Sequence, residues 1–323
     1  MFGKLCDVVI SKSDGTSLVL CNHADQPNTY YCEGTIERYE GTQTDSLVIS
    51  IYNLPSTVRG QIALESYSLI TVLWGYKDDG EDQLSELFMG NIQRIIFQKP
   101  DAVSTVTKIW AYDTGEFGTL GFFTGSFANG VNYYEIAQTV LTQGNYSPES
   151  VQLSEKLKDY AVQGCEAYYG SSNEIMGEVA NECGLVYKSS YQQSLLLTPE
   201  EIVNQENAIQ FSYYDEQTRR VESKSGLVNI PSLSDDGLYF DCLIIPKLTV
   251  NKLIQIDNSV ITIDQEGAVS SAEYGATLDP DGIYVIVNMT VEFNNGPNQN
   301  TMRCKAYSRS IYLDTYNNED EEE

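Results

Sequence analysis

Two long stretches of the chain consist of short apolar runs that are separated by turn residues. The first stretch covers residues 46–113 and the second covers residues 225–309. Short apolar runs broken by Gly, Asn and Asp are typical of β-strands. The clearest period of two lies at residues 103–112, where one face would hold Val106, Lys108, Trp110 and Tyr112 and the other Thr105, Thr107, Ile109 and Ala111. Strands this frequent predict a small closed or nearly closed sheet.

Further elements follow from the same pattern. A short helix is expected at residues 57–65, after Pro55. In the first half, strands are expected at residues 5–10, 18–20, 35–39, 47–52, 69–74, 87–92 and 94–97. In the second half, they are expected at residues 227–230, 238–245, 253–257, 260–263, 283–293 and 301–308.

The segment between the two stretches has a different character. Glycines space out aromatic residues at 113–125, which predicts an irregular connector. Apolar residues at helical spacing predict helices at 133–142 and 173–183, the second capped by Asn173 and followed by Gly184. A strand pair at 185–187 and 195–197 and a helix or turn at 199–204 complete the segment.

We therefore predict a mainly β protein with an α+β insert, in which two tube-like β-barrel modules flank a small helical or mixed region. The expected boundaries are 1–114 for the first barrel, 115–224 for the insert and 225–313 for the second barrel. Residues 314–323 are polar and acidic and are expected to be a disordered tail.

The net charge of −27 arises from 46 Asp and Glu against 19 Lys and Arg, and only five of the carboxylates lie at residues 319–323. Such a surface repels nucleic acid and anionic membranes. We therefore expect no specific grip on DNA, although DNA could pass along a repulsive wall. The sequence contains no run of about 18 apolar residues, so no membrane span is expected. The first residues lack the charged-then-apolar pattern of a secretory signal. The seven scattered cysteines are expected to be reduced core residues.

His23, the single histidine, is the first candidate for a metal-binding residue. Cys21, Asp25 and Cys32 lie nearby in the sequence, but their spacing is a poor match to a zinc site, which needs about four ligands at short loop spacing. We expect His23 to be an ordinary loop residue. A single histidine also disfavours a Ser-His-Asp or Cys-His arrangement.

A pair of carboxylates in unlike environments would indicate glycosidase chemistry. Asp113 and Glu116 are candidates only because acidic residues are abundant throughout the chain. Neither of the common glycine-rich phosphate loops is present. The sequence thus predicts no catalytic, cofactor-binding or metal-binding residue, no cofactor and no enzyme activity.

Eight stretches, taken in order along about 300 residues, resemble the baseplate hub proteins of tailed bacteriophages, the tail hub family of contractile-tailed phages. They are SLVISIYNL at 46–54, ITVLWGY at 70–76, LFMGNI at 87–92, TKIWAYD at 107–113, SGLVNIP at 225–231, DGL at 236–238, LIIP at 243–246 and DGIY at 281–284. The acidic loop at 78–82 and the acidic tail are departures from the family pattern.

The resemblance implies a homotrimer in which each chain supplies two similar modules, so that six modules match a six-fold tail tube or distal tube protein. The other side would receive a three-fold central spike protein. The axis would hold a channel for the tape measure protein and DNA, and the insert would meet the spike or the surrounding wedge proteins. The expected location is the virion baseplate, assembled in the host cytoplasm. We also expect many of the 46 carboxylates to face the channel.

Two other functions remain open on the sequence alone. The chain could be another tail ring or adaptor protein, of the distal tail or tube-like kind. It could also be a β-rich protein that binds glycans or degrades cell wall.

Overall fold

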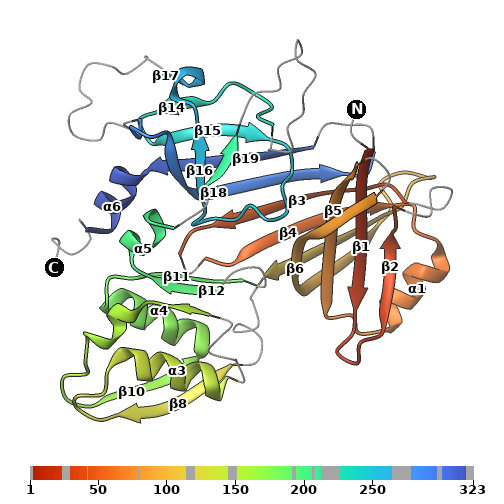
Figure 1. Cartoon of the computed structure of the whole chain (residues 1–323). Helices are drawn as coiled ribbons and strands as arrows, with labels where there is room; N and C mark the ends of the chain where they lie inside the picture. Colours follow the sequence, from red (N-terminus) through yellow and green to blue (C-terminus); the bar gives the residue numbers. More distant parts are fainter. Residues whose placement is uncertain are drawn as a thin grey trace.

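The structure of the protein is a computed structural model that describes residues 3–23, 30–41, 43–78, 81–113, 121–144, 151–190, 194–205, 208–211, 226–263, 278–296 and 300–317. Within these residues the fold is mainly β, as predicted, and one 14-stranded sheet runs through both β-rich stretches. A two-stranded and a three-stranded sheet lie in the middle segment. Figure 1 shows the middle segment at the bottom of the view, below the long strands β3, β4 and β18.

The elements of the first β-rich stretch are β1 (Gly3–Ser11), β2 (Ser17–Cys21), β3 (Cys32–Tyr39), β4 (Asp45–Tyr52), α1 (Ser56–Leu64), β5 (Leu69–Asp78), β6 (Glu81–Gln98) and β7 (Val106–Asp113). The elements of the second are β14 (Ser232–Ser234), β15 (Gly237–Cys242), β16 (Leu253–Ile256), η3 (Asn258–Val260), β17 (Thr262–Ile263), β18 (Ile283–Asn294), β19 (Thr301–Ser308) and α6 (Arg309–Asn317).

Between them the chain forms β8 (Phe122–Phe127), α3 (Tyr133–Gln143), β9 (Gln152–Leu153), η2 (Glu155–Lys158), β10 (Glu166–Ser171), α4 (Ser172–Glu182), β11 (Val186–Ser189), β12 (Ser194–Leu197), α5 (Pro199–Val203) and β13 (Ile209–Phe211). The last of these, β13, pairs with β16 of the large sheet.

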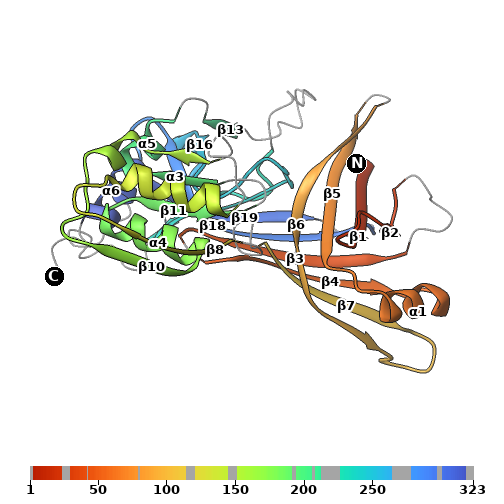
Figure 2. The ribbon, with the colours of Figure 1, turned by 90° about the horizontal axis from the view of Figure 1, so that it is seen from below.

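The two β-rich stretches repeat the same strand order. Neighbouring strands run β3-β4-β7-β6 in the first unit and β14-β15-β19-β18 in the second. In each unit two consecutive hairpins lie side by side, with the second strand of the first hairpin paired to the second strand of the next. The units join edge to edge, because β18 pairs antiparallel with β3 from Asn288 opposite Tyr39 to Asn294 opposite Glu33. Figure 2 shows the long strands that connect the two ends of the molecule.

The core explains why the two units fold together. Alternate residues of β4 are buried, which places Leu47, Ile49 and Ile51 on the inner face of the sheet. One continuous group of buried apolar side chains includes residues of both units. The ring of Trp74 from the first unit lies edge-on to that of Phe293 from the second, with centroids 6.2 Å apart. Aromatic pairs in this geometry stabilise a core beyond the area they bury.

The insert has its own core between its helices and the two-stranded sheet of β8 and β10. Ile136 and Val140 of α3 pack with Met176 and Val179 of α4, as their helical spacing predicts. Gly184 follows α4 with a φ of +59°, so its predicted place after the helix is confirmed. The predicted helices at 57–65, 133–142 and 199–204 correspond to α1, α3 and α5.

Four local predictions were wrong. Ser171, and not Asn173, caps α4, because its hydroxyl accepts from Glu174 N while the Glu174 carboxylate accepts from Ser171 N. Residues 227–230 form no strand beyond an isolated bridge between Leu227 and Cys242, and strand β14 begins one residue after Pro231. The connector expected at 113–125 ends in strand β8, where Gly125 leaves room for the Phe123 ring.

The fourth concerns the tail. Residues 314–317, expected to be disordered, belong to α6, because Tyr312 is buried and Tyr316 packs beside it with ring centroids 5.2 Å apart. The rest of the tail lies outside the described residues, as do residues 79–80 of the acidic loop at 78–82, whose other residues end β5 and begin β6. In the described part of the chain, no helix has the length and apolar character to cross a bilayer.

Candidate functional site

The feature that spans the whole molecule is the face of the large sheet that points away from the core. It runs over seven neighbouring strands, from β15 through β19, β18, β3, β4 and β7 to β6, and we call it the outer sheet face. Its residues line up in rows across the strands. One row holds Asp241, Arg303, Thr290, Glu37, Ser46, Tyr112 and Asn91, and the next holds Thr301, Glu292, Thr35, Val48, Trp110 and Arg94. All of these side chains are exposed or half-buried.

The charges on the outer sheet face balance. Along β15, β19, β18, β3, β4, β7 and residues 91–98 of β6, its carboxylates are Glu33, Glu37, Asp241 and Glu292, and its cations are Arg94, Lys108, Arg303 and Lys305. Four charges of each sign give a net charge of zero, in a chain whose net charge is −27. The excess of carboxylates therefore lies elsewhere on the molecule.

Neighbouring side chains hold two carboxylates of this face, Glu33 and Asp241. Glu33 accepts hydrogen bonds from Tyr31, at 3.1 Å, and from Tyr52. The bond to Glu33 favours the neutral phenol and raises the pKa of Tyr52 to about 12. In the second unit the Arg303 guanidinium donates to Asp241 Oδ1 at 3.1 Å. Glu33 is therefore held by two phenols, and Asp241 is paired with a cation of the same face.

Trp110 lies near the centre of this face in the first unit. The Arg94 guanidinium lies 5.6 Å from the Trp110 ring centre and the Lys108 ammonium 5.0 Å from it. Both distances fall within the range of cation–π attraction. Arg94 of β6 and Lys108 of β7 thus both stabilise the position of the Trp110 ring on β7.

Beneath one end of the outer sheet face, buried charges join the insert to the sheet. The Lys188 ammonium of β11 donates to Asp45 Oδ1 at 2.6 Å, to Tyr39 O at 2.7 Å and to Gln43 O at 2.9 Å. The side chains of Lys188 and Asp45 are only 2% and 5% exposed. Because all three ammonium protons find acceptors, the buried cation is fully satisfied. We call this group the junction.

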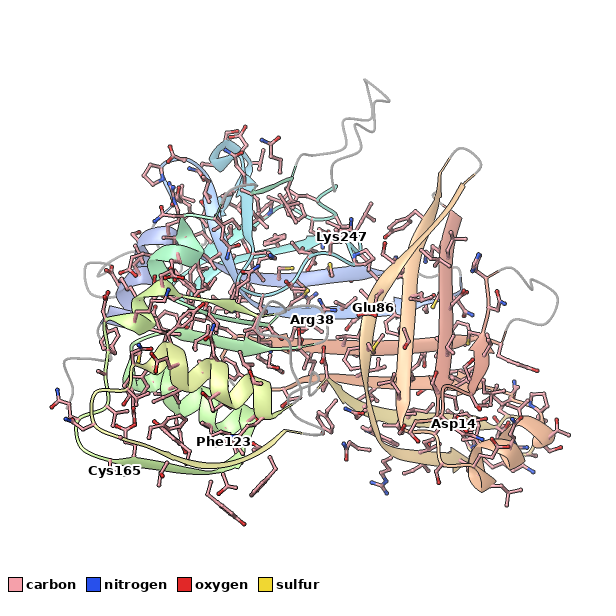
Figure 3. All side chains as sticks on the ribbon, turned by 60° about the horizontal axis from the view of Figure 1, so that its bottom comes forward. Asp14, Arg38, Glu86, Phe123, Cys165 and Lys247 are labelled. Carbon is pink, nitrogen blue, oxygen red and sulfur yellow. The ribbon has the colours of Figure 1, made fainter. Side chains whose placement is uncertain are left out.

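Arg38 extends the junction to the second unit. Its guanidinium donates to Leu248 O at 3.0 Å and to Leu87 O, and its Nε lies 3.9 Å from Asp45 Oδ2. Burial lowers the pKa of Arg38, while the charges of Asp45 and Asp113 oppose this shift. Figure 3 places Arg38 near the middle of the molecule, close to Glu86. One residue of β3 therefore contacts both units, and its neighbour Asp45 contacts the insert.

Glu40 lies between the junction and the C-terminal helix α6. Burial raises the pKa of the Glu40 carboxyl, and hydrogen bonds from Tyr312 and Tyr316 oppose this rise. Tyr312 also donates to Asn251 Oδ1 at 3.2 Å. The residues at the end of β3 thus meet the insert, the second unit and α6.

Of the residues considered for a metal site, His23 pairs with a carboxylate, since its Nδ1 lies 2.7 Å from Asp7 Oδ1. Cys21 and Cys32 come together with Cys6 in the core, and hydrogen bonds from the other two thiols lower the pKa of Cys32 to about 5. Asp25 lies outside the described residues. Across the described ranges, no group of three or more His, Cys, Asp or Glu side chains is arranged to hold a metal ion.

The two carboxylates considered for glycosidase chemistry do not form a described pair. Asp113 is only 3% exposed and lies opposite Asp45 in the β4–β7 register, next to the junction. Glu116 lies outside the described residues. The seven cysteines are free thiols, all buried except Cys165.

The junction was not foreseen from the sequence. A charged residue on the inner face of a strand is the signal that could have found it, since Arg38 follows buried Ile36 with a spacing of two. Lys188 gave a weaker signal, at the end of the apolar run 185–187.

The fold is that of phage tail proteins. Neither known family models nor curated proteins match the sequence. Among solved structures, a tail protein from Neisseria meningitidis has a TM-score of 0.53 at 9% identity and covers 96% of this chain and 98% of its own. The 43 kDa tail protein of prophage MuSo2 from Shewanella oneidensis has a TM-score of 0.52 at 9% identity, with the same coverage.

A third structure of this fold belongs to a secretion system. The E. coli c3393 protein, a component of the type VI secretion system, is itself structurally similar to the T4 tail proteins gp27 and gp5. It has a TM-score of 0.50 at 7% identity and covers 86% of this chain and 73% of its own. The suspected likeness to tail hub proteins is thus confirmed at the level of the fold.

Proposed function

We propose that the chain is a structural subunit of a phage baseplate hub, in which three copies form a ring with pseudo-six-fold symmetry. Residues 1–114 and 225–313 supply the two ring modules, and residues 115–224 supply the insert. The chain acts by geometry and not by catalysis. It joins a six-fold tail tube or distal tube protein to a three-fold central spike protein.

The observation that carries this proposal is the repeated strand order. The units β3-β4-β7-β6 and β14-β15-β19-β18 have the same order and lie edge to edge in one sheet. A ring of three such chains presents six similar units, which matches a six-fold partner on one side and a three-fold partner on the other. Two unlike halves would not serve this purpose.

The outer sheet face is the surface that we propose to line the channel. It runs without a break across both units, and its side chains stay accessible to solvent. Its described strands carry four carboxylates and four cations, which differs from the anionic wall expected from the composition. A wall with balanced charges would let the tape measure protein and DNA pass without binding either of them.

The proposed partners follow from this geometry. They are two further copies of the chain, the tube and spike proteins, the tape measure protein and the surrounding wedge proteins. The protein would reside in the virion baseplate after assembly in the host cytoplasm, and would guide DNA during ejection.

Native mass spectrometry of the purified full chain tests the subunit number. A hub predicts three copies of 36.0 kDa. Six copies would instead support a distal tail or tube-like ring. A monomer at every concentration, both alone and with its tail proteins, would contradict the proposal.

A further inference from the structure

The repeat between the two units leaves one strand edge without its counterpart. In the second unit, one edge of β18 pairs with β16 over residues 283–285 and with β3 over residues 288–294. In the first unit, the same edge of β6 pairs with β5 over residues 81–91. Across the described chain, residues 93–98 of β6 have no strand on this edge.

The equivalence extends to single residues. Ile92 of β6 lies opposite Ala111, and the register then shifts before Arg94. Ile286 of β18 lies opposite Ala306, and the register shifts in the same way before Asn288. β-bulges bend and twist a strand, so both strands turn at the same point of their units. Arg94 therefore corresponds to Asn288, and Phe97 corresponds to Val291.

The first strand of each unit can be matched in the same way. Ile36 of β3 lies opposite Leu47, which lies opposite Ala111. Leu233 of β14 lies opposite Leu238, which lies opposite Ala306. Leu233 is therefore the counterpart of Ile36, the residue that Val291 faces across the joint between the units.

We propose that residues 93–98 of β6 pair antiparallel with β14 of a second copy, in the register that β18 has with β3. Phe97 then lies opposite Leu233 of the partner subunit, and Gln98 opposite Ser232 of the partner subunit. This inference rests on the proposed function, and it names the surfaces through which the ring closes. The contact is heterologous, so it generates a closed ring when the rotation per chain allows.

Exposed apolar side chains at both edges support a second copy as the occupant. Phe97 is 39% exposed on one edge, and Ile230, just before β14, is 62% exposed on the other. Residues 93–98 of β6 form an open strand edge with an apolar side chain, and such an edge is a template for pairing with another chain. In the proposed register, Ile230 of the partner subunit lies opposite Pro100.

Charge complementarity points to the same partner. The β6 edge carries Arg94 and ends at Lys99, although the chain is strongly acidic overall. The turn after β14 carries Asp235 and Asp236. The proposed register brings Arg94 to this turn of the partner subunit, because Asn288, its counterpart, lies opposite Tyr39.

Within one chain, the edge of β14 that the second copy would use is already paired with strand β17. It pairs at only two positions, Ser232 with Thr262 and Leu233 with Ile263. The ring contact therefore requires β17 to leave this edge, and Ile263, at 57% exposed, loses little buried surface when it does so.

A cysteine cross-link tests the register. Gln98→Cys and Ser232→Cys are combined in a Cys165→Ser background, which removes the exposed native thiol. Residues opposite each other in antiparallel strands lie within the Cα range of a disulfide. Mild oxidation should give covalent dimers and trimers on non-reducing gels. Gln98→Cys with Ser46→Cys is the matched control and should stay monomeric, since Ser46 lies on β4, which is paired on both sides.

The outcomes separate this inference from the proposed function. A trimer by native mass spectrometry without cross-linked species from Gln98→Cys and Ser232→Cys would overturn the register and leave the hub proposal standing. A chain that stays monomeric by mass and shows no cross-link would overturn both.

Discussion

Lys188 donates to Asp45 across the boundary between the insert and the first β unit, at 2.6 Å and almost without contact with solvent. The same ammonium donates to the carbonyl oxygens of Tyr39, at the end of β3, and of Gln43, in the β3–β4 connection. Because the insert and the sheet share this buried cation, an ion pair and hydrogen bonds hold their relative orientation in addition to apolar packing.

Lys188→Met should therefore destabilise the fold. It leaves the Asp45 carboxylate buried beside a neutral side chain, which costs about 3–5 kcal/mol when a buried pair is broken. Urea denaturation measures the free energy of unfolding. Lys156→Met is the matched control, because the Lys156–Glu200 pair is about half exposed and its loss should cost less than about 1 kcal/mol. Equal effects of the two changes would refute the structural role of the junction.

Glu40→Gln should raise stability at pH 7. Burial raises the pKa of the Glu40 carboxyl above its ordinary value of 4.5, so the folded state favours the protonated form. The ionised carboxyl therefore lowers stability as pH rises from the ordinary value through the raised one. Unfolding measured across pH should show the gain of Glu40→Gln at neutral pH and its loss below 4.5, where the wild-type carboxyl is protonated in both states.

Glu37→Gln is the control for the loss of one charge, since Glu37 is exposed on the outer sheet face. A gain that is the same at all pH values, or equal in the two variants, would show that burial of Glu40 is not the cause.

Gly34→Ala should weaken the joint between the two units. A Cβ at Gly34 would lie 2.6 Å from Phe293 Cζ and 3.2 Å from Val48 O, and such overpacking costs about 1–3 kcal/mol. Gly60→Ala is the control, because apart from the adjoining helix backbone no atom lies within 4 Å of its Cβ, and a helical alanine is favoured by about 1 kcal/mol. Thermal unfolding should move in opposite directions for the two changes. A Gly34→Ala protein as stable as the wild type would contradict the tight contact at this joint.

Ser171→Ala should destabilise α4 by about 1 kcal/mol, since it removes the hydroxyl that accepts from Glu174 N. Ser171→Asp keeps an acceptor at the cap and should restore most of this loss. The comparison is made by urea denaturation of the three proteins. Equal stability of the alanine and aspartate variants would show that the cap contributes nothing.

The sequence predicted what local periodicity determines. The alternation at 103–112 placed Trp110 and Ile109 on opposite faces, and the structure confirms both. The helices α1, α3 and α5 lie within a residue or two of their predicted bounds, since their apolar stripes and end residues are local signals. The cap of α4 was misplaced because Ser171 and Asn173 are both suitable residues and only the Glu174 contact decides between them.

Long-range relationships could not be read from the sequence in the same way. The pairing of Asn288 with Tyr39 joins residues about 250 positions apart, and no local pattern encodes that choice. The junction depends on Arg38, Asp45 and Lys188, which are charged residues that solvation would normally keep on the surface. Their burial becomes visible only when the insert is placed against the sheet.

Cryo-electron microscopy of the chain assembled with its tail proteins tests the central proposal most directly. We expect three copies whose two units occupy six near-equivalent positions around one axis, with Trp110 and Arg303 of the outer sheet face pointing toward the lumen. A ring in which the two units lie at different radii, or in which this face is buried against another protein, would contradict the account.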